Sequence, residues 1–217
     1  MAKGARAAGP RARRLRQSRS EIKDRYLVVT EGLVTEPRYF EGIQRQLERV
    51  QIVVDPKPGR KQWESNPRAV VEHCVERRNN DLKDCGKGTR DKDPFRAVFA
   101  VVDVDQWDLP PKGGGPSQLQ QAISLAQAEG VNLIISNCKF EVWLLYHVRE
   151  KIGVGCSSLS SSCESSGLLE GKNLSKSFPF GDYKVACQRA DSQSLSEFGN
   201  VGSYPSTAMP RFFDIVA

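Results

Sequence analysis

The chain has 217 residues, which leaves room for one substantial core with an appendage or for two small domains. No run of about 18 uninterrupted apolar residues occurs, so the sequence excludes a membrane-spanning helix. The basic N-terminus is not followed by an apolar segment, so we expect no secretory signal and a cytoplasmic location.

The positive charge is concentrated at the N-terminus. Residues 1–20 carry seven Lys and Arg side chains and no acid, and subtracting them from the net charge of +6 leaves the other residues at −1. We predict a disordered basic arm over residues 1–22. Such an arm attracts phosphate backbones without reading their sequence; the alternative is a solubilising tail that has no partner.

The six cysteines form no CxxC pair, and neither His73 nor His147 lies beside the spaced cysteine pairs that zinc sites use. This pattern argues against a zinc site. Without an export signal we expect free thiols in a reducing cytosol. The cysteines are Cys74, Cys85, Cys138, Cys156, Cys163 and Cys187.

The first predicted strand is the β-branched run 26–30, which stops at Glu31-Gly32. Pro37 then opens an amphipathic helix, because a proline is well tolerated in the first helical turn. A second strand is predicted over residues 51–55. Asn66 is a candidate N-cap for a helix that runs through Val75, and the polar residues 79–93 are predicted to form a loop.

The strongest strand signal covers residues 96–102 and runs directly into Asp103-Val104-Asp105. After a loop rich in Pro and Gly, a helix begins near Leu119 and stops at Gly130. A fourth strand over residues 131–135 and a buried helix over residues 140–147 complete the regular pattern.

Strands without polar alternation, each followed by a helix, indicate an α/β domain over residues 23–150. Its parallel sheet of about four strands would have helices on both faces. The pattern weakens after residue 150. The serine-rich segment 156–166 is predicted to be a linker or an inserted loop. Short helices over residues 181–190 and 209–216 would form a helical C-terminal extension over residues 151–217.

Glu31 and the pair Asp103 and Asp105 each follow a predicted strand. Ligands collect at the carboxyl ends of strands in such sheets. Asp103 and Asp105 would share one side of an extended segment. Carboxylates gathered there would repel one another without a cation, and their oxygens suit Mg²⁺, with Mn²⁺ as the alternative ion. The other interpretation is a solvated acidic turn.

A strand-terminal Glu-Gly followed by a strand-terminal DxD resembles the Toprim signature of topoisomerases, primases and related nucleases. This resemblance implies a Toprim-like sheet in which Glu31 transfers a proton. It also implies that Asp103 and Asp105 coordinate magnesium for phosphodiester chemistry.

Three longer segments resemble the RloB family, and the resemblance extends over roughly residues 13–217. It implies a Toprim-type nuclease of restriction and abortive-infection defence loci that acts with an AAA-type ATPase partner. The chain departs from the family pattern at Val104, where a basic residue is common, and at Cys138, where proline is usual. The matching segments are 28–40 (VVTEGLVTEPRYF), 100–107 (AVVDVDQW) and 135–147 (ISNCKFEVWLLYH).

Five further residues are candidates for supporting roles. Glu36 is an additional ligand or base, or else an acid that complements the dipole of a helix in its first turn. Glu141 is a functional carboxylate or a structural hydrogen-bond partner, and Asn137 positions a ligand or caps a helix. Lys172 and Lys176 resemble a basic pair of the family that touches phosphate; solvated surface lysines are the alternative.

The favoured hypothesis is a metal-dependent nuclease that acts in phage defence, with DNA and RNA both open as substrates. The alternative is a non-catalytic Toprim-fold subunit that binds nucleic acid or regulates a defence complex, which the nearly neutral charge outside the arm favours. A nucleotide-sugar transferase that holds manganese through its DxD is disfavoured by the short chain and by the earlier Glu31-Gly32.

Overall fold

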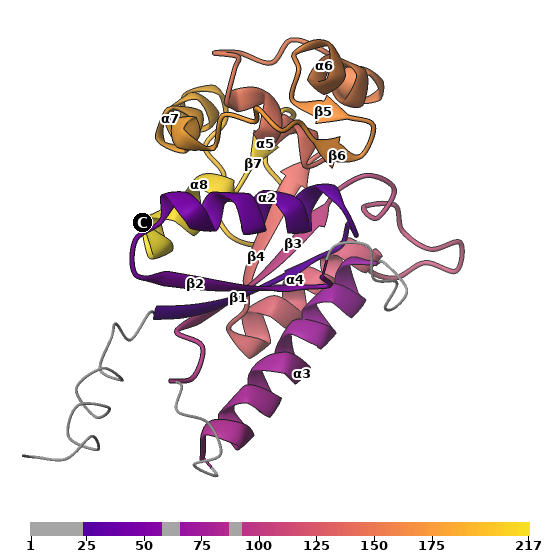
Figure 1. Ribbon diagram of the computed structural model, residues 1–217. Helices are drawn as coiled ribbons and strands as arrows, with labels where there is room; N and C mark the ends of the chain where they lie inside the picture. Colours follow the sequence, from indigo (N-terminus) through magenta and orange to yellow (C-terminus); the bar gives the residue numbers. More distant parts are fainter. Residues whose placement is uncertain (1–23, 58–65, 87–92) are drawn as a thin grey trace, which may run out of the picture.

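The computed structural model describes residues 24–57, 66–86 and 93–217 (Figure 1). The basic arm predicted over residues 1–22 lies outside the described residues. A five-stranded sheet of order β2-β1-β3-β4-β7 forms the centre of the molecule. Its strands are β1 (Asp24–Thr30), β2 (Val50–Asp55), β3 (Ala97–Asp103), β4 (Asn132–Asn137) and β7 (Ser206–Thr207).

The four longer strands are parallel to their neighbours, so the predicted parallel α/β sheet is confirmed. The short β7 adds an antiparallel fifth strand at the edge, beside β4. Only two residues of β7 pair, which is too short a run for a strand pattern to show in the sequence.

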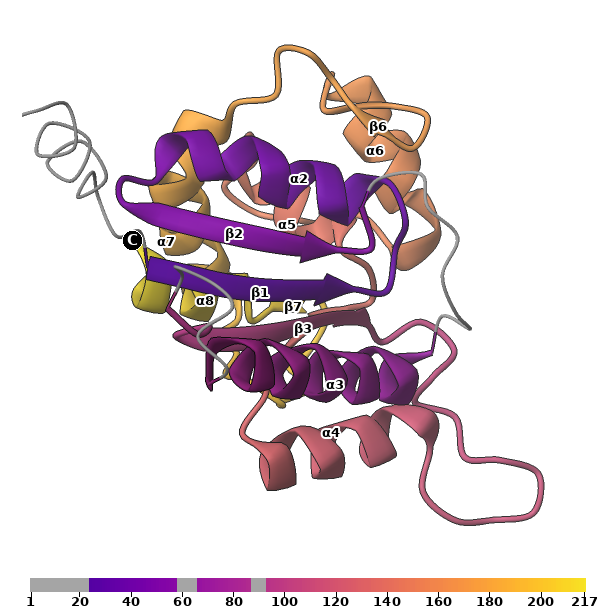
Figure 2. The ribbon, with the colours of Figure 1, turned by 60° about the horizontal axis from the view of Figure 1, so that its bottom comes forward.

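Helices cover both faces of the sheet (Figures 1 and 2). Leu27 and Val29 of β1 belong to the apolar cluster under one helical layer, whereas Tyr26 and Val28 belong to the cluster on the opposite face. Both faces of the strand are therefore buried, which explains its unbroken apolar run. One layer is α3 (Pro67–Gly86) and α4 (Gln118–Glu129); the other includes α2 (Thr35–Ile43), α5 (Glu141–Tyr146) and α8 (Met209–Val216).

Local signals set several of the helix boundaries, including the predicted cap at Asn66 and the predicted stop at Gly130. The Asn66 side chain accepts a hydrogen bond from the amide of Ala69 at 2.9 Å, as an N-cap does. Ser117 and Gln120 form a reciprocal capping box at the start of α4. Gly130 ends α4 with a φ of 63°, a conformation that costs glycine little.

Two predicted loops are partly helical. The prediction of a loop over residues 79–93 is wrong in its first part, because α3 continues to Gly86. The serine-rich segment 156–166 is also not a linker. It forms a short 3₁₀ turn, η2 (Cys156–Ser158), and then α6 (Leu159–Ser165), and the buried Leu159 and Cys163, one turn apart, give α6 its apolar side.

The C-terminal helices α6 and α7 (Tyr183–Gln193) pack against α5 in the upper part of Figure 1. Leu159, Phe178 and Tyr183 belong to the same apolar cluster as Tyr26 of β1 and Phe40 of α2. None of the helices in the described part of the chain is long and apolar enough to span a bilayer. The elements not yet named are η1 (Gln44–Gln46), β5 (Leu169–Glu170), β6 (Asn173–Leu174) and η3 (Phe180–Asp182).

A disulfide joins Cys138 to Cys156, so the expectation of free thiols is wrong for this pair. It ties the loop between β4 and α5 to the start of η2, and Cys156 is its exposed partner. The two cysteines lie 18 positions apart with no signature spacing, so only the folded chain brings them together. Cys74 and Cys163 keep their thiols, and burial raises the pKa of each to about 12.

Candidate functional site

The carboxyl ends of β1 and β3 lie side by side, as the predicted site requires. The two strands are paired, and the amide of Glu31 continues the ladder by donating to the carbonyl of Val101 at 3.0 Å. The Glu31 side chain then accepts a hydrogen bond from the amide of Asp103 at 3.3 Å. Glu31, which directly follows β1, thus contacts Asp103, the last residue of β3.

A pocket of about 440 Å³ opens at this edge of the sheet. Its wall combines residues that follow β1, β3 and β4 with the tip of the β5–β6 hairpin. Five carboxylates and two lysines that lie far apart in the sequence therefore meet in one cavity. They are Glu31, Glu36, Asp103, Asp105, Glu141, Lys139 and Lys172.

The two aspartates reach the pocket by a route that the sequence does not show. Asp103 is the last residue of β3, and Asp105 already lies in a turn with a φ of 31°. The amide of Asp105 donates to the carbonyl of Cys138 at 3.2 Å. The prediction that the two side chains share one side of an extended segment is therefore wrong, and the turn directs Asp105 to the pocket. Aspartate tolerates a positive φ better than most residues do.

Glu31 is held by Trp107 as well as by β3. The indole Nε1–H of Trp107 donates to Oε1 of Glu31 at 2.7 Å. Burial raises the pKa of Glu31 above its usual value, the hydrogen bonds from Asp103 and Trp107 oppose this shift, and the charge of Asp105 adds to it. Sequence reasoning missed Trp107; the signal was an aromatic residue two positions after the DxD.

Glu36 lies in the first turn of α2 and is only 9% exposed. Burial, reinforced by the charges of Glu141 and Glu31, raises its pKa to about 7. Gly32 makes room for this carboxylate, because a Cβ at position 32 would lie 2.0 Å from Oε2 of Glu36. The Glu-Gly pair thus supplies one carboxylate of the pocket and the space for another.

Burial also raises the pKa of Asp103 well above its usual value, and the charges of Glu36 and Glu31 are the next largest causes. A cation among these carboxylates would relieve the repulsion, and their oxygens are the ligands that Mg²⁺ prefers. The chemistry of the donors therefore fits a hard divalent ion. As the side chains stand in the described ranges, no three Asp, Glu, His or Cys residues are gathered closely enough to hold one.

Of the two candidate lysines, Lys172 and Lys176, only one lines the pocket. Lys172 lines the pocket, and the hydroxyl of Thr35 at the start of α2 fixes its position by donating to the Lys172 carbonyl at 2.8 Å. Lys176 is exposed and does not line the pocket. Lys139, which the sequence reasoning did not single out, takes a place in the wall two residues after β4. Its position after a strand next to β3 was the available signal.

Of the candidates Glu141 and Asn137, only Glu141 lines the pocket. Glu141 begins α5 and lines the pocket, where it accepts a hydrogen bond from the hydroxyl of Ser160 on α6 at 2.9 Å. Asn137 ends β4 but does not line the pocket; its amide donates to the carbonyl of Gly202 at 2.8 Å. Val104, where the family pattern favours a basic residue, is buried in the cluster under α3 and α4.

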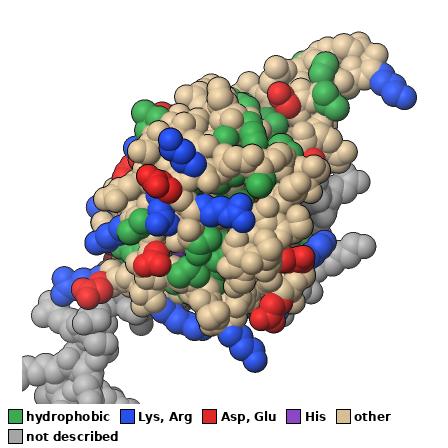
Figure 3. All heavy atoms as spheres, turned by 90° about the horizontal axis from the view of Figure 1, so that it is seen from above, with side chains coloured by type: hydrophobic (Ala, Val, Ile, Leu, Met, Phe, Trp, Pro, Cys, Tyr) green, Lys and Arg blue, Asp and Glu red, His purple; other side chains and the backbone are tan. Residues whose placement is uncertain are grey.

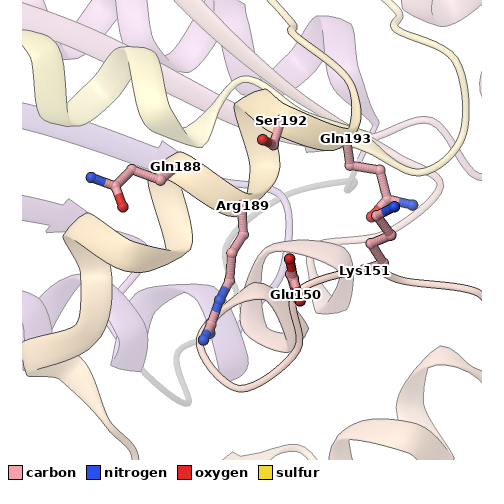
Figure 4. A pocket seen from close by; sticks show the side chains of 6 residues that line it. All are labelled: Glu150, Lys151, Gln188, Arg189, Ser192 and Gln193. Carbon is pink, nitrogen blue, oxygen red and sulfur yellow. The ribbon is translucent and has the colours of Figure 1, made fainter.

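Another cavity, of about 310 Å³, lies between α7 and the segment after α5 (Figure 4). Its side chains already hold the backbone in place. Arg189 donates to the carbonyls of Tyr146 and His147, and Gln193 bonds both the amide and the carbonyl of Ile152. These contacts give the cavity a structural explanation.

The fold and the pocket together define an α/β protein with a carboxylate-lined pocket at the carboxyl edge of a parallel sheet. The chain matches the RloB-like protein family over residues 26–214 and belongs to that family. Comparison with curated proteins and with solved structures found no match.

Proposed function

We propose that this protein is a metal-dependent phosphodiesterase of the Toprim type that cuts nucleic acid. The observation that supports this proposal most strongly is the pocket itself, where Glu31 and Asp103 approach each other through a hydrogen bond at the carboxyl edge. Cleavage of a phosphodiester needs positive charge near the phosphate oxygens and a group that transfers a proton. Lysines of the first kind and carboxylates of the second line this cavity.

Each residue has a role in this proposal. Asp103 and Asp105 would hold Mg²⁺ or Mn²⁺, which when bound neutralises phosphate charge and activates water. Glu31 would move the proton, and burial, which raises its pKa, favours a group that can both accept and release one. Lys139 and Lys172, which also line the pocket, would contact phosphate oxygens. Glu36 and Glu141 add negative charge that strengthens the attraction for the cation.

The defence role and the ATPase partner are a further part of the proposal. They rest on the resemblance to the RloB family that residues 28–40 and 135–147 carry, and on membership of the RloB-like family. In this proposal the ATPase licenses cutting. Full cleavage by the isolated chain at low concentration would argue against that dependence.

A non-catalytic subunit is the second candidate, and the charge distribution favours it. Residues 21–217 carry a net charge of −1. Figure 3 shows acidic, basic and apolar side chains interspersed over the face seen from above, without a continuous basic field. Nucleic acid is usually held by clustered Lys and Arg, so a chain of this kind can also serve as a regulatory component.

A cleavage assay with matched variants tests the proposal. The full chain is incubated with duplex DNA, single-stranded DNA and structured RNA, in Mg²⁺, in Mn²⁺ and in EDTA, with and without the proposed AAA-type ATPase partner. We expect metal-dependent cutting that Glu31→Gln and Asp103→Asn abolish. Asp108→Asn is the control, since Asp108 is exposed in the loop after β3 and does not line the pocket. Cutting that survives Asp103→Asn, or binding without cutting in every condition, contradicts the proposal.

A further inference from the structure

Trp107 lines a third cavity and is hydrogen-bonded to Glu31 of the carboxylate-lined pocket, which is called the acidic pocket below. The third cavity has a volume of about 300 Å³ and lies between the loop after β3 and the start of α4. Trp107 lines it, and the same indole donates its Nε1–H to Glu31 of the acidic pocket. A molecule in this third cavity would therefore contact the residue that holds Glu31 in place.

The lining of this cavity suits a flat, uncharged ring. Trp107, Leu109, Pro111 and Pro116 supply apolar surface, and Leu109 is 72% exposed. Gln106 and Gln118 supply amide groups that can donate and accept hydrogen bonds. Among the described residues that line this cavity, none carries a charge. The lysines that could meet a phosphate group, Lys139 and Lys172, line the acidic pocket instead.

The backbone holds Trp107 rigidly. Its amide donates to the carbonyl of Val104 at 2.9 Å, and its carbonyl accepts from the amide of Leu119, in the first turn of α4, at 3.1 Å. The backbone of Trp107 is thus anchored between β3 and α4, and the hydrogen bond from its indole N–H to Glu31 holds the ring. An aromatic side chain fixed in this way can stack on a base at a low entropic cost.

We propose that this cavity is a nucleobase subsite, in which a base next to the phosphate in the acidic pocket stacks on Trp107. The inference rests on the proposed function and names the class of substrate: a strand with an unpaired base, since the edges and faces of paired bases are not free to enter a side pocket. The Gln amides then contact the edge of the base, and the apolar side chains contact its face.

Binding to strands with and without bases separates this subsite from backbone recognition. A short labelled oligothymidylate and an abasic strand of equal length are titrated against the full chain carrying Asp103→Asn, so that no cutting interferes. We expect the strand with bases to bind between about 5-fold and 150-fold more tightly, the range for one stacked base. Equal affinity for the two strands overturns the inference.

Substitution of Trp107 separates its two roles. Trp107→Phe keeps an aromatic ring and loses the N–H that reaches Glu31, while Trp107→Ala loses both. The preference for bases should therefore survive in Trp107→Phe and disappear in Trp107→Ala, with cleavage reduced in both. Gln118→Ala at the rim is a milder variant for the case in which Trp107→Ala fails to fold, and it should weaken the preference. A preference that all three variants retain overturns the inference.

The outcomes also distinguish the subsite from the proposed function. Metal-dependent cutting that does not discriminate between strands with and without bases leaves the phosphodiesterase standing and removes the subsite. A base preference that depends on Trp107, in a protein that never cuts, leaves the subsite standing and removes the phosphodiesterase.

Discussion

Replacing Glu36 by Gln should stabilise the metal-free protein, and by more at high pH than at low pH. The folded chain raises the pKa of Glu36 from 4.5 to about 7. Because the folded state holds this proton more tightly than the unfolded state, the stabilising contribution is complete below about pH 4.5. It declines as the pH rises and is lost above about pH 7. A glutamine has no proton to lose, so its contribution does not change over this range.

The expected magnitude follows from the shift. Each unit of pKa corresponds to about 1.4 kcal/mol, so the whole shift corresponds to about 3 kcal/mol as an upper bound. Between pH 5 and pH 8 the difference in unfolding free energy between Glu36→Gln and wild type should therefore grow by about 2–3 kcal/mol in favour of the variant. Urea unfolding at several pH values in EDTA measures this difference.

Glu41→Gln is the matched control, because Glu41 lies on the same helix and is exposed. It lies outside the pocket lining, so the gain expected at position 36 should be absent. Added Mg²⁺ should shrink the effect at position 36, since a cation among the carboxylates lowers the free energy of the charged form. A Glu36→Gln difference that does not change with pH, or that turns against the variant as pH rises, would refute this account of the pocket.

Three further predictions concern single positions. Gly32→Ala should displace the Glu36 carboxylate, because the new Cβ would meet Oε2 at 2.0 Å, and the pH dependence described above should diminish in unfolding curves. Cys156→Ser should lower the free energy of unfolding by about 2–4 kcal/mol, since the disulfide closes a loop of 18 positions. Reductant should bring wild type to the same melting temperature, and a wild-type melting curve that does not respond to reductant would contradict this. Lys139→Ala should weaken nucleic-acid binding and reduce the salt slope by about one, measured by titration at several salt concentrations; an unchanged slope would place Lys139 away from phosphate.

Much of the fold could be predicted because its signals are local. The apolar runs that became β1 and β3, the Asn66 cap and the Gly130 stop each depend on neighbours in the sequence. The α6 helix could not be predicted in the same way. Its serines favour a loop, and burial of Leu159 and Cys163 against the rest of the core stabilises the helix. The two residues of β7 pair with a strand about 70 positions earlier, so they left no local pattern.

The candidate site likewise contains residues with local sequence signals and residues whose places depend on the folded chain. Glu31, Asp103 and Asp105 could be found because each follows a strand whose neighbours the parallel topology determines. Lys139 and Trp107 carried only weak signals, because their places in the site depend on how the loops after β3 and β4 turn. The positive φ of Asp105 and the Cys138–Cys156 disulfide belong to that same loop structure.

The most direct test of the central claim is the shift in melting temperature that Mg²⁺ produces in wild type and in Asp103→Asn. If the carboxylates after β1 and β3 form one cation site, Mg²⁺ at about a hundredfold excess over its dissociation constant should stabilise wild type by about 2.7 kcal/mol. Asp103→Asn should melt higher than wild type in EDTA, because it removes one of the mutually repelling charges, and should gain much less from Mg²⁺. An Asp103→Asn protein that melts lower in EDTA and keeps the full Mg²⁺ shift would show that Asp103 is a structural residue and that the cation binds elsewhere.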